Sequence, residues 1–231
     1  MIDIDFGYQY YPLEVGKYWT YAVDSVIYDP EIGGTAIDTT YSFIKEEIKD
    51  TLRDNLGELL YRVERYHRSH DTLPWKVQAA LTMSRNDRQA FRTEDNLRFI
   101  KMVFPASVNK RWDGNAFIDD GLLIPIAGEN VEVFKDWESA IVAQGEAFQL
   151  DDLEFPDVLD ISIADEENFI EYRSGREVYA AGTGLVYREL WVLDTQCQSC
   201  CNGDGALCET LPWEEKAEKG FIVRWKLIDF R

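Results

Sequence analysis

The sequence predicts a mainly β protein, built as a single antiparallel curved sheet or incomplete β-barrel with one or two short helices. Runs rich in Val, Tyr, Trp and Leu recur along the chain, and several alternate between apolar and polar residues with the period of a strand. Glycine-containing turns separate many of these runs. A length of 231 residues suits one large β domain, so we expect residues 1–231 to form a single β-rich domain.

The clearest element is a hairpin predicted over Phe169–Leu193. Two β-like runs flank Ala181-Gly182-Thr183-Gly184, and glycine can adopt the positive φ of a tight turn without strain. In the second run Tyr187 and Trp191 share one parity, and the residues of the other parity are also largely apolar. We therefore expect a central strand that is covered on both faces.

The same patterns place the other elements. Two segments allow alternatives: Asp136–Gln149 is a short helix or a strand with an alanine-rich face, and Thr39–Arg68 has apolar residues at helical spacing but a turn-like tetrad, Asp54-Asn55-Leu56-Gly57, at its centre. The stretch Lys110–Asn115 has the composition of a loop. Further strands are predicted at 18–23, 75–83, 89–93, 97–104, 157–163 and 220–230.

The charge of the chain excludes some partners. A net charge of −19 argues against a nucleic-acid surface, which requires clustered Lys and Arg, and against a basic membrane-binding patch. No apolar run approaches the roughly 20 residues that a membrane helix needs. No signal-peptide pattern follows Met1, so the chain is either cytosolic or a mature form of an exported protein with a new start methionine.

The sequence contains no motif that selects an enzymatic reaction. The nucleophile elbow, the P-loop, the dinucleotide fingerprint and HExxH are all missing, so we predict no catalytic residue, no cofactor and no metal ligand. The acidic tract from Asp151 to Glu167 is expected to be a solvated face rather than a calcium site. The 43 acidic residues still offer many carboxylate pairs, which leaves a carboxylate-dependent hydrolase open as an alternative.

Four cysteines cluster in one short segment. Cys197, Cys200, Cys201 and Cys208 could form disulfides that staple a loop, a zinc site, or a set of reduced thiols. We favour disulfides because the number of cysteines is even and the residues are close in sequence. A zinc site is less favoured because two adjacent cysteines do not readily face one metal ion. We expect Cys197–Cys208 or Cys200–Cys208, with a bond between neighbouring Cys200 and Cys201 the least expected pairing.

Six aromatic side chains are candidates for a ligand-binding face. A curved sheet with an aromatic concave face can supply an apolar pocket. The alternative is that these rings fill the core, as side chains do in most small barrels. The candidates are Trp19, Tyr21, Trp75, Tyr187, Trp191 and Trp225.

Three phrases resemble those of uncharacterised bacterial cell-envelope lipoproteins. Tyr10–Asp24 is similar to an "FPLxVGxxWxY" opening, Phe104–Asn115 to an "FP…WxGN" phrase, and Glu177–Glu189 to a "YAxGVGLV" phrase in which Thr183 replaces the usual Val. The resemblance implies an antiparallel β-rich fold, of which an open barrel like the lipoprotein-carrier folds is one form, and it favours a hairpin for Thr39–Arg68. It implies no activity and no catalytic residue.

The resemblance also implies export to the cell envelope, as a periplasmic protein or an outer-membrane lipoprotein. Membrane contact would then come only through a lipid anchor that is absent from this chain. We expect a non-enzymatic envelope protein that binds an apolar small molecule or an envelope protein partner. The alternatives are the hydrolase and a plain structural or interaction module.

Overall fold

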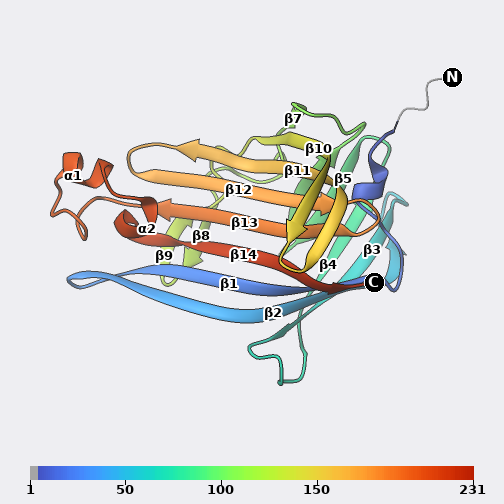
Figure 1. The fold of residues 1–231 in the computed structure, drawn as a ribbon, viewed down its shortest axis with the longest axis horizontal. Coiled ribbons are helices and arrows are strands. Elements are labelled where there is room, and N and C mark those ends of the chain that lie inside the picture. The colour runs from blue at the N-terminus through green and yellow to red at the C-terminus, as the bar shows by residue number, and fades with distance from the viewer. Residues whose placement is uncertain (1–4) are drawn as a thin grey trace.

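The computed structural model describes residues 5–231, and most of them join one 12-stranded antiparallel sheet (Figure 1). The strand order is β6-β5-β4-β3-β2-β1-β14-β13-β12-β11-β10-β7, so the last strand lies beside the first. A separate hairpin pairs β8 with β9. The strands are β1 (Tyr18–Glu31), β2 (Gly34–Arg53), β3 (Leu59–Arg68), β4 (Lys76–Arg85), β5 (Gln89–Glu94), β6 (Leu97–Val103), β7 (Arg111–Trp112), β8 (Leu123–Ile126), β9 (Glu129–Glu132), β10 (Ser139–Leu150), β11 (Leu153–Glu167), β12 (Glu171–Ala180), β13 (Gly184–Asp194) and β14 (Lys219–Phe230).

The sheet curls into a nearly closed barrel, which confirms the predicted fold class. Its two edge strands meet through a few contacts near β7. The Ile100 backbone N–H donates to the Gly114 carbonyl at 2.8 Å, and the Trp112 indole N–H donates to the Ile100 carbonyl at 2.9 Å. The seam is short because β7 has only two residues, and the barrel is therefore incomplete along most of β6.

Alternation along the strands decides which side chains face the barrel interior. On β1, Trp19, Tyr21 and Val23 are buried in the main core, as every second residue of a strand points to the same face. A smaller core lies on the outer surface of the sheet, where Trp213 and Ala217 pack against residues of β13 and β14. The helices are short: η1 (Tyr8–Tyr10), α1 (Gly205–Glu209) and α2 (Trp213–Lys216).

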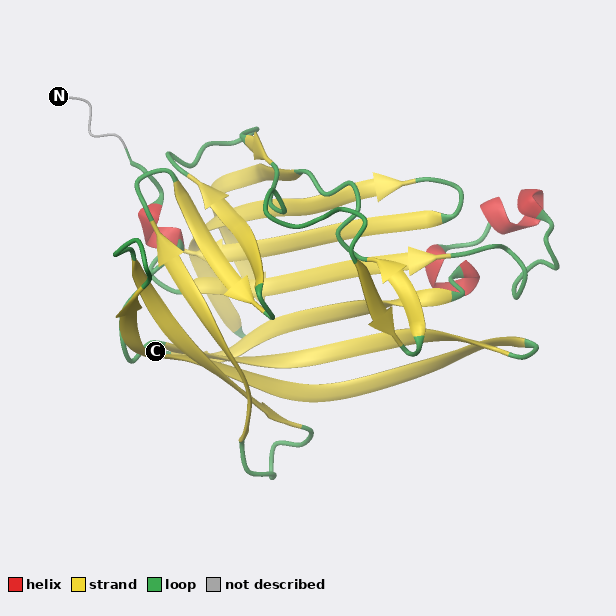
Figure 2. Cartoon of the chain, turned by 180° about the vertical axis from the view of Figure 1, so that it is seen from behind, coloured by secondary structure: helices red, strands yellow, loops and turns green. Residues whose placement is uncertain are grey.

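Residues 113–138, here called the cover segment, lie across the concave face of the sheet and include the β8–β9 hairpin (Figure 2). Their apolar side chains pack with those of β6, β13 and β14. Polar contacts hold the segment in place: Lys135 pairs with Glu171 at 3.0 Å, and Arg173 donates to the Glu132 carbonyl at 3.1 Å. The interior is thus covered on a side where the sheet alone would leave it open.

Several predicted elements are confirmed. Phe169–Leu193 forms the β12–β13 hairpin, and Asp136–Gln149 contributes most of strand β10 rather than a helix. Thr39–Arg68 forms the hairpin of β2 and β3, and its turn includes Gly57 at a φ of 81°. The turn tetrad therefore outweighed the helical spacing of the apolar residues.

Other expectations need correction. The alternation over 75–83 predicted a half-buried strand, but only Leu81 and Met83 near its end are buried, and Val77 is 69% exposed. Trp75 precedes β4 instead of belonging to it. The β8–β9 hairpin was not predicted. Within residues 5–231, no helix is long and apolar enough to cross a membrane.

Candidate functional site

A buried network of charges lies inside the barrel. Glu46 on β2 is 2% exposed and accepts hydrogen bonds from Arg65 Nε and Nη2 at 2.9 and 2.7 Å. It also accepts from Arg92 Nη2 at 2.5 Å. Glu94 pairs with both Arg65 and Arg92, which closes a ring of two carboxylates and two guanidinium groups. Each charge in the ring is compensated by an opposite one.

A second charged group crosses the interior from one half of the sheet to the other. Lys101 on β6 donates to Glu177 Oε1 on β12 at 2.6 Å, although the two residues are 76 positions apart. The Tyr179 hydroxyl donates to Glu177 Oε2 at 2.6 Å. Arg188 on β13 approaches Glu177 Oε1 at 3.6 Å with its Nε, which is an ion pair without a hydrogen bond.

These pairings keep the interior carboxyl groups ionised. Burial opposes ionisation of Glu46, but Arg92 and Arg65 outweigh it and hold the pKa of that carboxyl below its usual value. Burial likewise opposes ionisation of Glu177, and Lys101 with Arg188 lowers its pKa overall. Burial lowers the pKa of Lys101, and Glu177 offsets only part of that effect.

The carboxylate-dependent hydrolase expected as an alternative finds no support in this network. Every carboxyl group of residues 5–231 with a shifted pKa is shifted downwards, whereas general acid catalysis needs a carboxyl whose pKa is raised. The interior carboxylates are engaged with cations and suit binding better than proton transfer.

The charged network lines an inner compartment together with an aromatic wall. Trp19, Tyr21 and Trp225 belong to this wall, and each is at most 7% exposed. Their polar atoms are partly used in holding the fold: the Trp19 indole donates to the Thr183 carbonyl at 2.6 Å, and the Tyr21 hydroxyl to the Leu185 carbonyl at 3.0 Å. The free space is about 30 Å³, which is room for one or two water molecules.

An outer compartment of about 270 Å³ adjoins the inner one. The two share the side chains of Arg92, Lys101, Arg188 and Trp225, so charged groups form the boundary between them. Asp95, in the turn between β5 and β6, is an exposed member of the lining and marks a route to solvent. The apolar lining comes from β6, β13, β14 and the cover segment, through Leu97, Phe99, Val133, Phe134, Leu190 and Val223.

Two donors on the lining of the outer compartment have no partner. The Nε of Arg188 and the indole Nε1 of Trp137 are buried and form no hydrogen bond within residues 5–231. Buried polar groups are nearly always paired in folded proteins, because an unpaired one costs free energy. Two residues that line the outer compartment therefore each keep a hydrogen-bond donor without an acceptor.

The structure brings together only part of the predicted aromatic set. Trp19, Tyr21 and Trp225 line the inner compartment, and Trp225 also borders the outer one. Tyr187 and Trp191 lie on the outer surface of β13, where both donate to Glu189. The expectation of one shared concave face is thus corrected for these two residues, since they alternate with the inward Arg188.

Trp75 is also outside the cavity. Its ring lies under the Arg68 guanidinium, 4.4 Å from the ring centroid, near the strand that it was predicted to begin. Sequence reasoning missed the charged residues that dominate the interior: Glu46, Arg92, Lys101, Glu177 and Arg188. The position of Glu46 in its strand could have identified it, because it lies between Ile44 and Ile48 on the buried face of β2.

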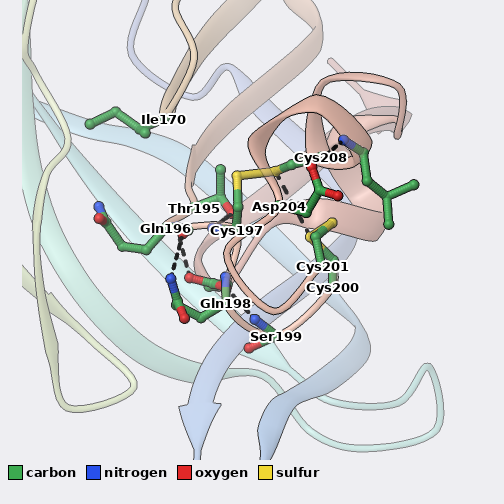
Figure 3. The surroundings of a disulfide bond; sticks show 12 residues. Ile170, Thr195, Gln196, Cys197, Gln198, Ser199, Cys200, Cys201, Asp204 and Cys208 are labelled. Carbon is green, nitrogen blue, oxygen red and sulfur yellow. Dashed lines mark hydrogen bonds between the residues drawn. A yellow bond between two sulfur atoms is a disulfide. The ribbon is translucent and has the colours of Figure 1, made fainter.

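The cysteine loop carries α1, which lies at the opposite end of the sheet from η1 (Figure 1). Figure 3 shows the surroundings of its disulfides. Cys197 is bonded to Cys208, one of the two favoured pairings. Cys200 is bonded to Cys201, the least expected pairing, which corrects that ranking. Once Cys208 is engaged, the two neighbours have only each other as partners.

The same loop contains a grouping of possible metal-ligand atoms. The sulfur atoms of Cys200, Cys201 and Cys208 lie within 4.8 Å of one another. As disulfides they offer no thiolate to a zinc ion. The loop is held instead by Glu218, whose carboxylate accepts backbone N–H donors of Gln196 at 2.7 Å and of nearby residues.

No protein-family model matches the chain, and no curated protein matches it. Among solved structures, it is similar to a candidate exported protein with a YmcC-like fold from Bacteroides fragilis, at 10% identity and a TM-score of 0.37, over 95% of this chain and 97% of that one. It is also similar to a candidate lipoprotein from Parabacteroides distasonis, at 9% identity and a TM-score of 0.36, over 99% and 100% of the two chains. Such scores are too low to transfer a function, so the cavity alone supports the proposal below.

Proposed function

We propose that this protein binds a small apolar ligand inside its barrel and catalyses no reaction. The observation that carries the proposal is the outer compartment, whose volume of about 270 Å³ is lined mainly by apolar side chains. Small-molecule sites are concave, mostly apolar, contain a few polar groups, and begin at roughly 300 Å³. A ligand that fits here is therefore small.

A small molecule is favoured over a protein partner by the position of the apolar surface. Leu190 and Val223 face the barrel interior beneath the cover segment, where a folded protein surface cannot reach them. The aromatic rings of the inner compartment, by contrast, are packed with little space between them. These rings form the bottom wall of the site and leave no space for the ligand between them.

The proposed location is the cell envelope. Two disulfides in the loop from Cys197 to Cys208 favour an oxidising compartment, because cytosolic thiols are generally kept reduced. The phrases that resemble those of envelope lipoproteins point the same way. A lipid anchor preceding this chain is part of the same proposal.

A matched pair of variants tests the binding site. Val223→Phe adds a ring to the outer compartment, whereas Val77→Phe makes the same change on an exposed part of β4. Titration with decanoate, followed by calorimetry and by the total tryptophan fluorescence, is expected to show one saturable site. Binding should weaken at least about tenfold in Val223→Phe and stay unchanged in Val77→Phe.

Thermal unfolding of both variants checks that each remains folded. The proposal is wrong if neither decanoate nor the neutral 1-decanol binds saturably to the unmodified protein. It is also wrong if the folded Val223→Phe variant binds as tightly as Val77→Phe, because the probe would then occupy another surface.

A further inference from the structure

The charges inside the barrel do not cancel. The buried ion-pair network contains four cationic side chains, Arg65, Arg92, Lys101 and Arg188, and three carboxylates, Glu46, Glu94 and Glu177. Of these, Arg65 belongs to the network but lines neither compartment. The surplus is positive although the whole chain carries −19. Asp95 does not remove it, because that carboxylate is exposed and screened by solvent.

The surplus can be assigned to Arg188. Arg65 and Arg92 both hydrogen-bond to Glu46, and Lys101 hydrogen-bonds to Glu177. Within residues 5–231, the one ion pair of Arg188 is the 3.6 Å approach to Glu177, and its Nε has no acceptor. The half-buried guanidinium of Arg188 is therefore a positive charge without a hydrogen-bonded counter-ion.

A second donor lines the same compartment. The Trp137 ring packs on Phe134 with centroids 5.6 Å apart, which positions the indole, but its Nε1 has no acceptor. Arg188 itself lies over the Trp225 ring, 5.3 Å from the centroid, so its guanidinium is also positioned. Both donors are fixed by packing and neither is used to hold the fold.

We infer that the ligand of the outer compartment is an amphiphile with one oxyanion head, bound by Arg188 and Trp137. This inference rests on the proposed function and names the chemistry of its ligand. An oxyanion supplies both the missing charge and the missing acceptors, and the apolar wall formed by Leu190 and Val223 receives the tail. A carboxylate and a phosphate monoester share this chemistry.

A series of probes with the same ten-carbon tail and different heads tests the inference. Decanoate and decyl phosphate are expected to bind at least about tenfold more tightly than 1-decanol, and decyltrimethylammonium is expected to bind most weakly. The ratio between the first two probes tells which anion the site prefers. Calorimetry on the full chain measures all four affinities.

Two variants then locate the head. Arg188→Gln is expected to lower the preference for decanoate over 1-decanol to about threefold, the share that Trp137 still provides. Trp137→Phe keeps the ring and removes only the N–H, so the preference for decanoate should fall about threefold while 1-decanol is unaffected. Arg224→Gln removes a cation from the outer surface of β14, where it pairs with Glu189, and should leave the preference unchanged.

The outcomes separate the two proposals. If 1-decanol binds as tightly as decanoate to the unmodified protein, the oxyanion head is overturned while the apolar site stands. If Arg224→Gln lowers the preference as much as Arg188→Gln, the effect is one of net charge and the inference fails. If no probe binds saturably, the proposed function fails as well. If Arg188→Gln does not fold, Trp137→Phe tests the oxyanion head instead, and an unchanged preference for decanoate in that variant would contradict it.

Discussion

Two consecutive charged residues of β13, one on each face of the sheet, differ in how completely they are paired. Glu189 points to the outer surface and accepts hydrogen bonds from the Tyr187 hydroxyl at 3.0 Å and the Trp191 indole at 2.8 Å, and it also pairs with Arg224. Arg188 points inward, and its Nε has no acceptor. The two side chains are almost equally exposed, at 24% for Glu189 and 22% for Arg188, yet Glu189 has three partners while the buried Nε of Arg188 has none.

This difference is opposite to what stability alone favours. An unpaired polar group costs little at a surface, where water replaces the partner, and costs more in an interior. Departures of this kind are expected at functional sites, since a group kept ready for a ligand cannot also be used by the fold. The comparison thus agrees with the ligand site proposed on the inner face of β13 and with a role in stability for its outer face.

The largest expected effect comes from removing one carboxylate on each face. Glu46→Gln leaves Arg65 and Arg92 with an uncharged partner in the interior, and the free energy of unfolding should fall by about 3–5 kcal/mol. Glu189→Gln removes a partly exposed acceptor, and the loss should be about 1–2 kcal/mol. Urea unfolding at neutral pH measures both.

Equal losses in the two variants would contradict the contrast between the faces. A Glu46→Gln variant too unstable for a urea transition would still be informative, because its thermal midpoint can be compared with that of Glu189→Gln. A smaller loss in Glu46→Gln than in Glu189→Gln would show that the interior ring contributes little to folding.

Much of the fold was predictable because strand alternation and turn chemistry are local signals. The turn at 54–57 correctly outweighed the helical spacing in Thr39–Arg68, and the glycine pair around Thr183 correctly placed the β12–β13 hairpin. These features depend on a few neighbouring residues, which the sequence displays directly.

The charged interior was not predictable in the same way. Glu46 lies in a run rich in Glu and Lys, and only the pairing of β2 with β3 shows that Arg65 lies opposite it. Arg92 reaches the same carboxylate from β5, 46 residues away. A charge in a strand is usually solvated, and partners at such separations become visible only when the sheet curls.

Parity alone also could not assign the aromatic residues to a face. Both parities of β13 are largely apolar, so Tyr187 and Trp191 could have faced either side. The bulge in the pairing of β12 with β13, between Val178 and Tyr179, further shifts the alternation near the turn. The pairing of Cys200 with Cys201 likewise depended on Cys208 being engaged elsewhere.

A smaller effect is expected from acid. The interior carboxyls of Glu46 and Glu177 have pKa values lowered in the folded state, below the value of about 4.3 of an unfolded Glu. Each therefore stabilises the fold above that value, and this stability is lost as the pH falls through the folded pKa. The pKa of the outer Glu189 is lowered as well, so the unmodified protein is the reference here. Stability should decline below about pH 5, and less steeply in Glu46→Gln than in the unmodified protein. Urea midpoints at pH 7 and pH 3 test this, and parallel declines in the two proteins would refute an interior origin.

The smallest expected effect is a difference in how one tyrosine on each face contributes to the loss of stability at high pH. Burial, and then Glu177, raises the pKa of the interior Tyr179 well above its usual value. Burial, and then Glu189, raises the pKa of Tyr187 on the outer surface to about 12. A raised folded pKa stabilises the protein below the unfolded value of about 10, and that stability is lost as the pH rises beyond it. Both hydroxyls stay protonated in the folded state up to about pH 11, so the two tyrosines differ only once the pH exceeds the pKa of Tyr187. Tyr179→Phe should therefore remove more of the loss of stability between pH 8 and about pH 12.5 than Tyr187→Phe does, as measured by urea unfolding at the two pH values. If Tyr187→Phe removes as much, alkali does not distinguish the two faces, and the shielding of the interior from water is weaker than the pairing of Glu177 with Tyr179 and Lys101 implies.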